Sequence, residues 1–250
     1  MQGAEAISAL GHEAQGVVVL GAHPSASAGF LVPLIAELSR THPEVRIELT
    51  EGTTPVLTEK LVAGQVDLAL RNTWPEQPDL PLTYESLWHE PFVAVIPEDH
   101  PLAALPEPFA PVVLSDSPLI SIGRPGNQIE PEVARVIKEW DADLDLVLHT
   151  EQPQTLANLV RVGLGIGLIN SLAMQISDTA GLALRRVGLS NEGRTVGVWW
   201  DQDRYMSSAS KVVLDAIREA PVPPSTRALN SARAEGASAG GGEEGPTPVE

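Results

Sequence analysis

Residues 17–52 read VVVLGAHPSASAGFLVPLIAELSRTHPEVRIELTEG, and this stretch decides the fold class. The apolar run 17–20 predicts a buried strand, and the alternation of apolar and polar residues over 45–49 predicts a second strand. Between them, apolar residues spaced three and four apart predict one face of a helix; they are Phe30, Leu31, Leu34, Ile35 and Leu38. A strand, a helix and a strand in this order predict a right-handed crossover in a parallel sheet.

The same alternation continues along the chain. Thr54 is expected to cap a helix over 55–62 with Pro55 at its first position, and a strand is expected at 66–70. A strand at 92–96 and a Pro-rich connection lead into a second unit of similar size. That unit has predicted strands at 119–122, 144–148 and 166–169 and helices at 129–140 and 155–162. A strand at 196–200 and a helix capped by Ser207 follow.

The composition excludes several classes of protein. The 250 residues contain no cysteine, so disulfides and thiolate metal sites are absent. The chain has 33 acidic and 16 basic residues and a formal charge of −17. Such a charge repels phosphate backbones, so this chain is expected to make no direct contact with nucleic acid. The alternative is that the negative charge only makes the protein soluble. A membrane-spanning helix needs an apolar run of about 18 residues, and no run in this sequence comes near that length. The N-terminus also lacks the features of an export signal, so a cytoplasmic protein is expected.

Motifs for catalysis are missing from the sequence. There is no GxSxG elbow, no GxxxxGK loop and no zinc-protease helix, and the six histidines show no ligand-like spacing. Gly163, Gly165 and Gly167 are interpreted as a helix end and a tight turn. We therefore expect no enzyme activity, no metal and no cofactor, although acid–base pairs assembled in space leave no motif.

A binding site is expected beyond the carboxyl ends of the parallel strands. The segments there are rich in hydroxyl and amide groups, which suit a small polar molecule. Loop ends are usually polar, so each residue can equally be an ordinary loop residue. The candidates from this reasoning are Ser25, Ser27, Thr53, Arg71, Arg124, Asn127 and Thr155. Two helices are expected to begin at this site, one after Ser27 and one near Thr155, and helix N-termini favour anions. Arg71 or Arg124 could supply the positive charge for an organic anion. The alternative is that both arginines are surface residues paired with carboxylates.

The residues 17–52 resemble the start of the effector-binding domain of LysR-type transcriptional regulators. Four later stretches resemble further segments of that family in the right order: LVAGQVDLAL, EPFVAVIPEDHPLA, SDSPLISIG and LANLVRVGLGIGLIN. Asn170 stands where the family usually has proline. The match covers about residues 16–220.

The resemblance implies an α/β fold of periplasmic-binding-protein type 2, with two lobes joined by crossing hinge strands. Lobe one would hold 16–97 and 196–220, and lobe two 98–195. It also implies a small-molecule effector in the interlobe cleft, contacted by hydroxyls of the first loop, where Ser25 and Ser27 lie, and by the loop Ser121 to Asn127. The resemblance also implies a homo-oligomer whose copies pair through the helix at 30–40. Leu31, Leu34 and Leu38 of this helix would contact either the partner or the core of the same chain.

The resemblance includes neither the winged helix-turn-helix domain of the family, through which it would contact DNA, nor its full linker helix. Residues 1–15 resemble the last turns of that linker, while a misread start, a fragment and a stand-alone sensor all remain open. Residues 221–250 are rich in Pro, Ser, Ala, Gly and Glu and predict a disordered tail. From about residue 223 on, this tail is expected to be dispensable for stability. The alternative function is a stand-alone solute-binding protein of periplasmic-binding type, against which the missing export signal argues.

Overall fold

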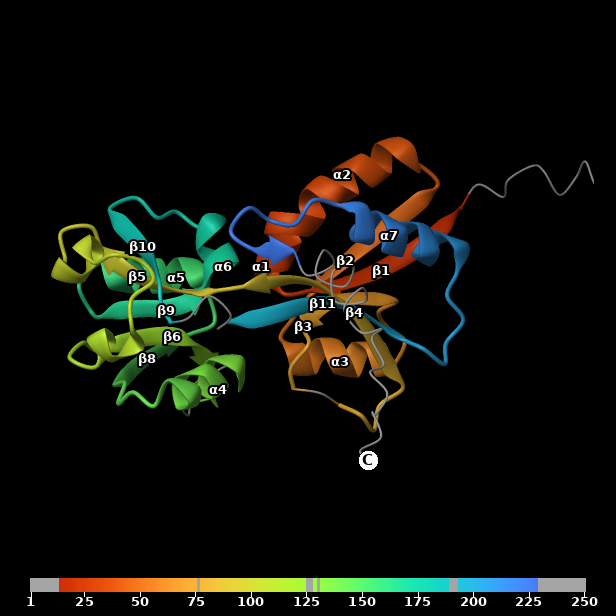
Figure 1. Ribbon diagram of the computed structural model, residues 1–250. Helices are drawn as coiled ribbons and strands as arrows, with labels where there is room; N and C mark the ends of the chain where they lie inside the picture. The colour runs from red at the N-terminus through yellow and green to blue at the C-terminus, as the bar shows by residue number, and fades with distance from the viewer. Residues whose placement is uncertain (1–13, 76, 125–127, 130, 189–192, 229–250) are drawn as a thin grey trace, which may run out of the picture.

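The computed structural model describes residues 14–75, 77–124, 128–129, 131–188 and 193–228. These residues form two α/β lobes, each built on one mixed sheet with helices on both faces (Figure 1). The sheet of lobe 1 has the strand order β12-β4-β11-β3-β1-β2. The sheet of lobe 2 has the order β10-β5-β9-β6-β7, with β8 paired to β6. The expected two-lobed fold is therefore confirmed.

Lobe 1 combines the first part of the chain with its end. Its strands are β1 Gly16–Ala22, β2 Val45–Glu51, β3 Leu68–Asn72, β4 Leu82–Glu90, β11 Arg194–Asp201 and β12 Arg227–Ala228. Its helices are α1 Pro24–Ala26, a π-helical turn Ser27–Leu31, α2 Val32–Thr41, α3 Thr54–Val62 and α7 Ser208–Glu219. β1 pairs in parallel with β2 and β3, as the crossover pattern predicts, whereas β11 is antiparallel to β3 and β4.

Side-chain alternation along β1 divides the core of lobe 1 into two layers. Val18 and Leu20 pack with α2 and α7 on one face of the sheet. Val19 points to the other face, where Leu57 and Leu61 of α3 pack against Trp199. Because neighbouring residues of a strand point to opposite faces, a continuous apolar run serves both layers of a sheet covered on both sides.

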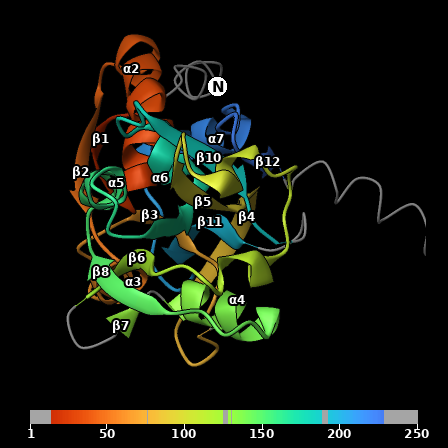
Figure 2. The ribbon, with the colours of Figure 1, turned by 90° about the vertical axis from the view of Figure 1, so that its left-hand side faces the viewer.

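Lobe 2 follows the same plan. Its strands are β5 Phe92–Pro97, β6 Leu119–Arg124, β7 Gln128–Ile129, β8 Leu146–Thr150, β9 Ile166–Asn170 and β10 Leu182–Arg186. Its helices are α4 Pro131–Trp140, α5 Pro153–Arg161 and α6 Ser171–Gln175, with two 3-10 turns at Pro101–Ala104 and Pro111–Leu114. Figure 2 looks onto this lobe, where α4 covers one face of the sheet and α5 and α6 cover the other.

The crossing between the lobes lies earlier in the chain than expected. β4 belongs to lobe 1 and β5 to lobe 2, so the chain changes sheets at Pro91 and not after Pro97. It returns between β10 and β11. Strand β4, with the sequence LTYESLWHE, was not expected because its charged residues hide the period-two alternation.

Two ends differ from the expectation in opposite ways. Residues 1–13, which include most of the expected linker remnant, lie outside the described part of the chain. The segment from Pro221 to Ala228, expected as the start of a disordered tail, instead packs on lobe 1. Val222 contacts its core, and β12 pairs with β4. Residues 229–250 lie outside the description.

Candidate functional site

A cavity of about 450 Å³ opens between the two lobes. Lobe 1 lines it with the segments that follow β1 and β2 and with the start of β11. Lobe 2 lines it with the end of β9 and with the starts of α4 and α5. The ends of parallel strands, where α/β proteins usually bind ligands, therefore face one another across a single cleft. Its volume suits a small molecule.

Three of the helices that begin at the wall of this cavity have an N-cap residue in the wall and a proline in the first turn. His23, Thr53 and Gln152 occupy the N-cap positions of α1, α3 and α5, and all three line the cavity. Each helix carries proline in its first turn, and no side chain caps the first-turn N–H groups. Such N–H groups and the partial positive charge of a helix start favour an anion. Thr54, expected as the cap of α3, is instead its first residue.

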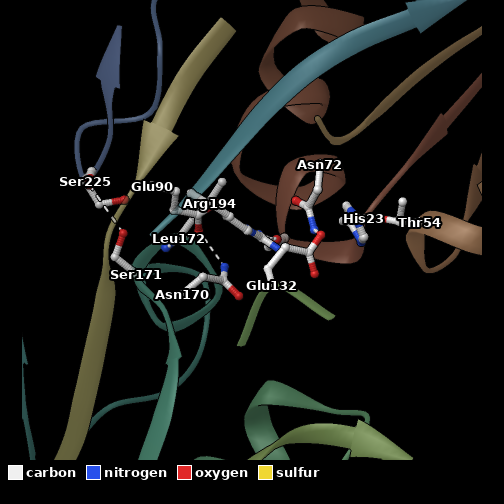
Figure 3. Close-up of polar contacts among 11 residues, drawn as sticks. His23, Thr54, Asn72, Glu90, Glu132, Asn170, Ser171, Leu172, Arg194 and Ser225 are labelled. Atoms are coloured by element: carbon white, nitrogen blue, oxygen red, sulfur yellow. Dashed lines mark hydrogen bonds and ion pairs between the residues drawn. The ribbon is translucent and has the colours of Figure 1, made fainter. Parts of the chain in front are cut away.

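Arg194 at the start of β11 is the cationic residue of the cavity wall among the residues that the structure describes. Its Nε donates to Glu90 at 2.8 Å, and its Nη2 donates to the hydroxyl of Ser25 at 2.9 Å. Glu90 is fully buried and also accepts from the side-chain amide of Asn170 at 2.5 Å and from the backbone N–H of Leu172 at 2.8 Å. Figure 3 shows Glu90 at the centre of these contacts, which tie both lobes together next to the crossing at Pro91.

Glu132 enters the cavity from the first turn of α4 in lobe 2. Its Oε1 accepts a hydrogen bond from the side-chain amide of Asn72 at the end of β3 in lobe 1. The residue is only 3% exposed, and burial raises the pKa of its carboxyl, while its own backbone N–H, Arg194 and Asn72 oppose that rise. One turn further along α4, Arg135 donates to the backbone oxygen of Gly193 at 3.1 Å. Helix α4 therefore holds lobe 1 through two side chains.

His23 is the other titratable residue buried in the cavity wall. Its Nε2 lies 3.1 Å from the hydroxyl of Thr54, which joins the first loop to α3. Burial, and then the positive charges of Arg194 and Arg71, lower the pKa of His23 to about 3. The imidazole is therefore neutral at physiological pH, and Arg194 remains the cation that a ligand in the cavity meets.

The model of the LysR substrate binding domain matches residues 11–221 of the chain. The chain belongs to this family. It is 25% identical over 210 residues to the HTH-type transcriptional regulator YybE of Bacillus subtilis, covering 84% of this chain and 70% of that protein. It is 24% identical over 194 residues to the regulator YnfL of Escherichia coli, covering 75% of this chain and 63% of that protein. The chain thus spans about two thirds of the length of these relatives.

Solved structures agree with the LysR assignment at the level of the fold. The effector binding domain of BenM with its effector benzoate superposes with a TM-score of 0.71 at 20% identity, covering 81% of this chain and 90% of that chain. The effector binding domain of QuiR in complex with shikimate gives a TM-score of 0.68 at 19% identity, covering 81% and 95%. The chain is thus a LysR substrate binding domain with the type 2 periplasmic-binding-protein fold.

Two of the residues predicted for the site, Ser25 and Thr53, line the cavity of this LysR domain. Thr155 has an exposed side chain, but its backbone N–H lies in the first turn of α5 beside the cavity. Ser27 is buried in the helical run behind Ser25, and its hydroxyl has no hydrogen-bond partner in the structure. Asn127 and the side chain of Arg124 lie outside the described part of the chain.

Arg71 and Ser121 are fully buried and do not line the cavity. The guanidinium of Arg71 stacks over the ring of Trp199 at 3.6 Å and donates to the backbone oxygen of Asn72. Burial lowers the pKa of Arg71 to about 10, so it stays charged at neutral pH. The hydroxyl of Ser121 donates to the backbone oxygen of Leu168 at 3.2 Å in the neighbouring strand.

Sequence reasoning did not select Arg194, Glu90 or Glu132 for the site. Arg194 begins an antiparallel strand, so its start meets the edge at which the parallel strands end. Only residues after the ends of predicted parallel strands were considered as candidates, and the start of an antiparallel strand such as β11 is not among them. Among the described residues, no cluster of three or more His, Cys, Asp or Glu side chains suits a metal ion. No described helix has the length and apolarity that a membrane crossing requires.

Proposed function

We propose that this LysR domain senses a small organic anion, a carboxylate, bound in the interlobe cleft. The main support for this proposal is Arg194, which lines the cavity and forms hydrogen bonds with Glu90 and Ser25. A guanidinium has five N–H donors, and these two contacts leave others for a ligand. The helix starts at His23, Thr53 and Gln152 add backbone donors around the same space.

The proposed contacts follow from the cavity wall. The hydroxyls of Ser25 and Thr53 and the backbone N–H groups at the start of α5, including that of Thr155, would bind the carboxylate together with Arg194. Arg71 and Ser121 would act from behind the wall, by stabilising the strands that carry it. Arg124 and Asn127 stay candidates of the second lobe. Benzoate and shikimate, named for the BenM and QuiR structures, are both carboxylates and support this class of ligand.

Ser25→Ala tests the carboxylate site. Calorimetry with benzoate, shikimate and a panel of other carboxylates, amines and neutral metabolites measures which class binds. The substitution should weaken carboxylate binding by about 1–3 kcal/mol, the range for a hydrogen bond to a charged group. Ser27→Ala is the matched control, because Ser27 lies in the same helical run but outside the cavity wall. A ligand class without an anionic group, or a carboxylate indifferent to Ser25→Ala, would contradict the proposal.

For the full regulator we infer control of transcription in the cytoplasm, in keeping with relatives that are transcriptional regulators. The formal charge of −17 makes this domain a poor partner for duplex DNA, so we assign DNA contact to another part of the regulator. We also infer a homo-oligomer, in which a change at the cleft can be passed between copies.

A further inference from the structure

Carboxylates outnumber cations on the wall of the interlobe cavity. Among the described residues, Glu51, Glu132 and Glu151 line it, against the single guanidinium of Arg194. That guanidinium already forms an ion pair with Glu90 at 2.8 Å, behind the wall. A ligand that is only an anion would therefore approach Arg194 past three carboxyl groups. A ligand that also carries a positive group would find a partner for each of its charges.

Glu132 is the carboxyl best placed to bind that positive group. It is buried, whereas Glu51 and Glu151 are exposed. The Asn72 amide fixes its carboxyl by a hydrogen bond across the cleft, and no ion pair of the described residues includes it. An ionised carboxylate offers about four lone-pair sites, so the bond to Asn72 leaves acceptor capacity for a ligand. Figure 3 shows Glu132 and Arg194 extending toward the same part of the cleft from opposite lobes.

We propose that the effector is a zwitterion whose carboxylate is bound by Arg194 and Ser25 and whose ammonium group is bound by Glu132. This inference rests on the proposed function and adds the second charged group of the ligand. The two contacts lie on different lobes, since Ser25 and Arg194 belong to lobe 1 and Glu132 to lobe 2. A zwitterion would therefore add a second link between the lobes, beside the backbone N–H groups of α5 that the carboxylate site already uses.

Burial adds a measurable consequence, because it raises the pKa of the Glu132 carboxyl in the empty cleft. An ammonium group favours the ionised carboxylate, so the affinity for a zwitterion should rise with pH as Glu132 ionises, whereas the affinity for a simple carboxylate should not. The charged groups that act on Glu132 are the guanidinium groups of Arg194 of β11, Arg135 of α4 and the buried Arg71 of β3. His23 is neutral between pH about 5 and about 7, so its titration does not contribute to this difference.

The experiment compares ligands matched in shape that differ in the ammonium group. The pairs are para-(aminomethyl)benzoate with para-ethylbenzoate, and ε-aminocaproate with heptanoate, titrated calorimetrically into the domain at pH about 7. We expect the zwitterion of at least one pair to bind about tenfold tighter than its partner. Lowering the pH to about 5 should weaken zwitterion binding more than binding of its partner, because a protonated Glu132 no longer attracts the ammonium group.

Glu132→Gln keeps an acceptor for Asn72 and removes the charge. It should abolish both the preference for the zwitterion and the pH dependence of that preference, and leave carboxylate affinity unchanged or tighter. Glu139→Gln, on the same helix but outside the cavity wall, removes the same charge and should keep both effects. If the simple carboxylates bind as tightly as the zwitterions and Glu132→Gln changes nothing, the inference is overturned and the carboxylate site stands. If no ligand of either kind binds, the carboxylate site falls and the inference with it.

Discussion

His23 links the cleft to the pH dependence of folding. Its pKa of about 3 in the native protein lies well below the ordinary value of 6.5, because burial and the neighbouring arginines disfavour the imidazolium. The unfolded chain binds a proton below pH about 6.5 and the native protein does not. The contribution of neutral His23 to the free energy of unfolding is therefore complete above pH about 6.5 and is lost as the pH falls toward 3.

We predict that His23→Gln flattens this acid dependence. Between pH about 7 and about 5, the wild-type free energy of unfolding should fall by about 2 kcal/mol more than that of the variant. Glutamine keeps a partner for the Thr54 hydroxyl, so the comparison isolates the proton. The measurement is urea denaturation at the two pH values. His42→Gln, at the end of α2 and away from the cavity, is the control. Parallel curves for the wild type and His23→Gln would refute the assignment.

Arg194 and Arg71 show how burial alone does not define a role. Arg71 is fully buried, and its guanidinium stacks on Trp199, where it stabilises the interface between β3 and β11. Arg194 keeps 10% of its side chain exposed, and that exposed part belongs to the cavity wall. The residue that the ligand can reach is therefore the one whose partners, Glu90 and Ser25, hold it at the surface of the cleft.

At the scale of single elements, α7 has the clearest local signal. Ser207 was expected to cap this helix, and its hydroxyl accepts a hydrogen bond from the backbone N–H of Ser210 at 3.0 Å. Ser207→Ala should cost about 1 kcal/mol, which corresponds to a melting temperature lower by about 2–4 °C. Ser208→Ala, exposed in the first turn of the same helix, is the control and should leave the midpoint unchanged. Thermal denaturation followed by circular dichroism distinguishes the two variants.

The segment before residue 229 gives a second prediction at this scale. Arg227 and Ala228 pair with β4, and the backbone oxygen of Ser225 accepts from the hydroxyl of Ser171 at 3.3 Å. Truncation after Val222 should therefore lower the melting temperature by about 2–4 °C, equivalent to about 1 kcal/mol. Truncation after Ala228 removes only the polar, Gly-rich sequence and should leave the midpoint unchanged. Equal midpoints for both truncated chains would show that β12 contributes nothing.

At the scale of the whole molecule, association between copies must use residues outside the core. Leu31, Leu34 and Leu38, which were offered either to a partner or to the core, are all buried inside lobe 1. Val32 of α2 is instead 56% exposed. If α2 pairs with the second lobe of another copy, as the LysR resemblance implies, Val32 is the large exposed apolar side chain of α2 that the partner would cover.

We predict that light scattering at about 50 μM gives twice the mass of one chain, a concentration at which a specific interface of ordinary size is populated. Val32→Glu should shift the mass toward the monomer, because it places a charge in a covered apolar contact. The matched control is Val112→Glu, at a position 65% exposed on a 3-10 turn of lobe 2, which should remain dimeric. A monomeric wild type, or equal masses for both variants, would refute pairing through α2.

The two α/β units were predictable because their signals are local. Apolar periodicity located β1, β2 and α2, and the glycine with positive φ at position 163 ends α5 as expected. β4 was missed because its residues have mixed burial and carry charges within the strand. β12 was missed because two residues in a polar segment carry no periodicity, and only their pairing with β4 defines them.

The sequence by itself determined the fold class, the family and the loops that surround the cleft, since each depends on patterns within a few tens of residues. The tertiary structure decided which side chains meet there. Arg194 contacts Ser25 across 169 positions and Glu90 across 104, and Glu132 contacts Asn72 across 60. No local pattern encodes such pairs, because they depend on the packing of two lobes and on an antiparallel strand starting where parallel strands end.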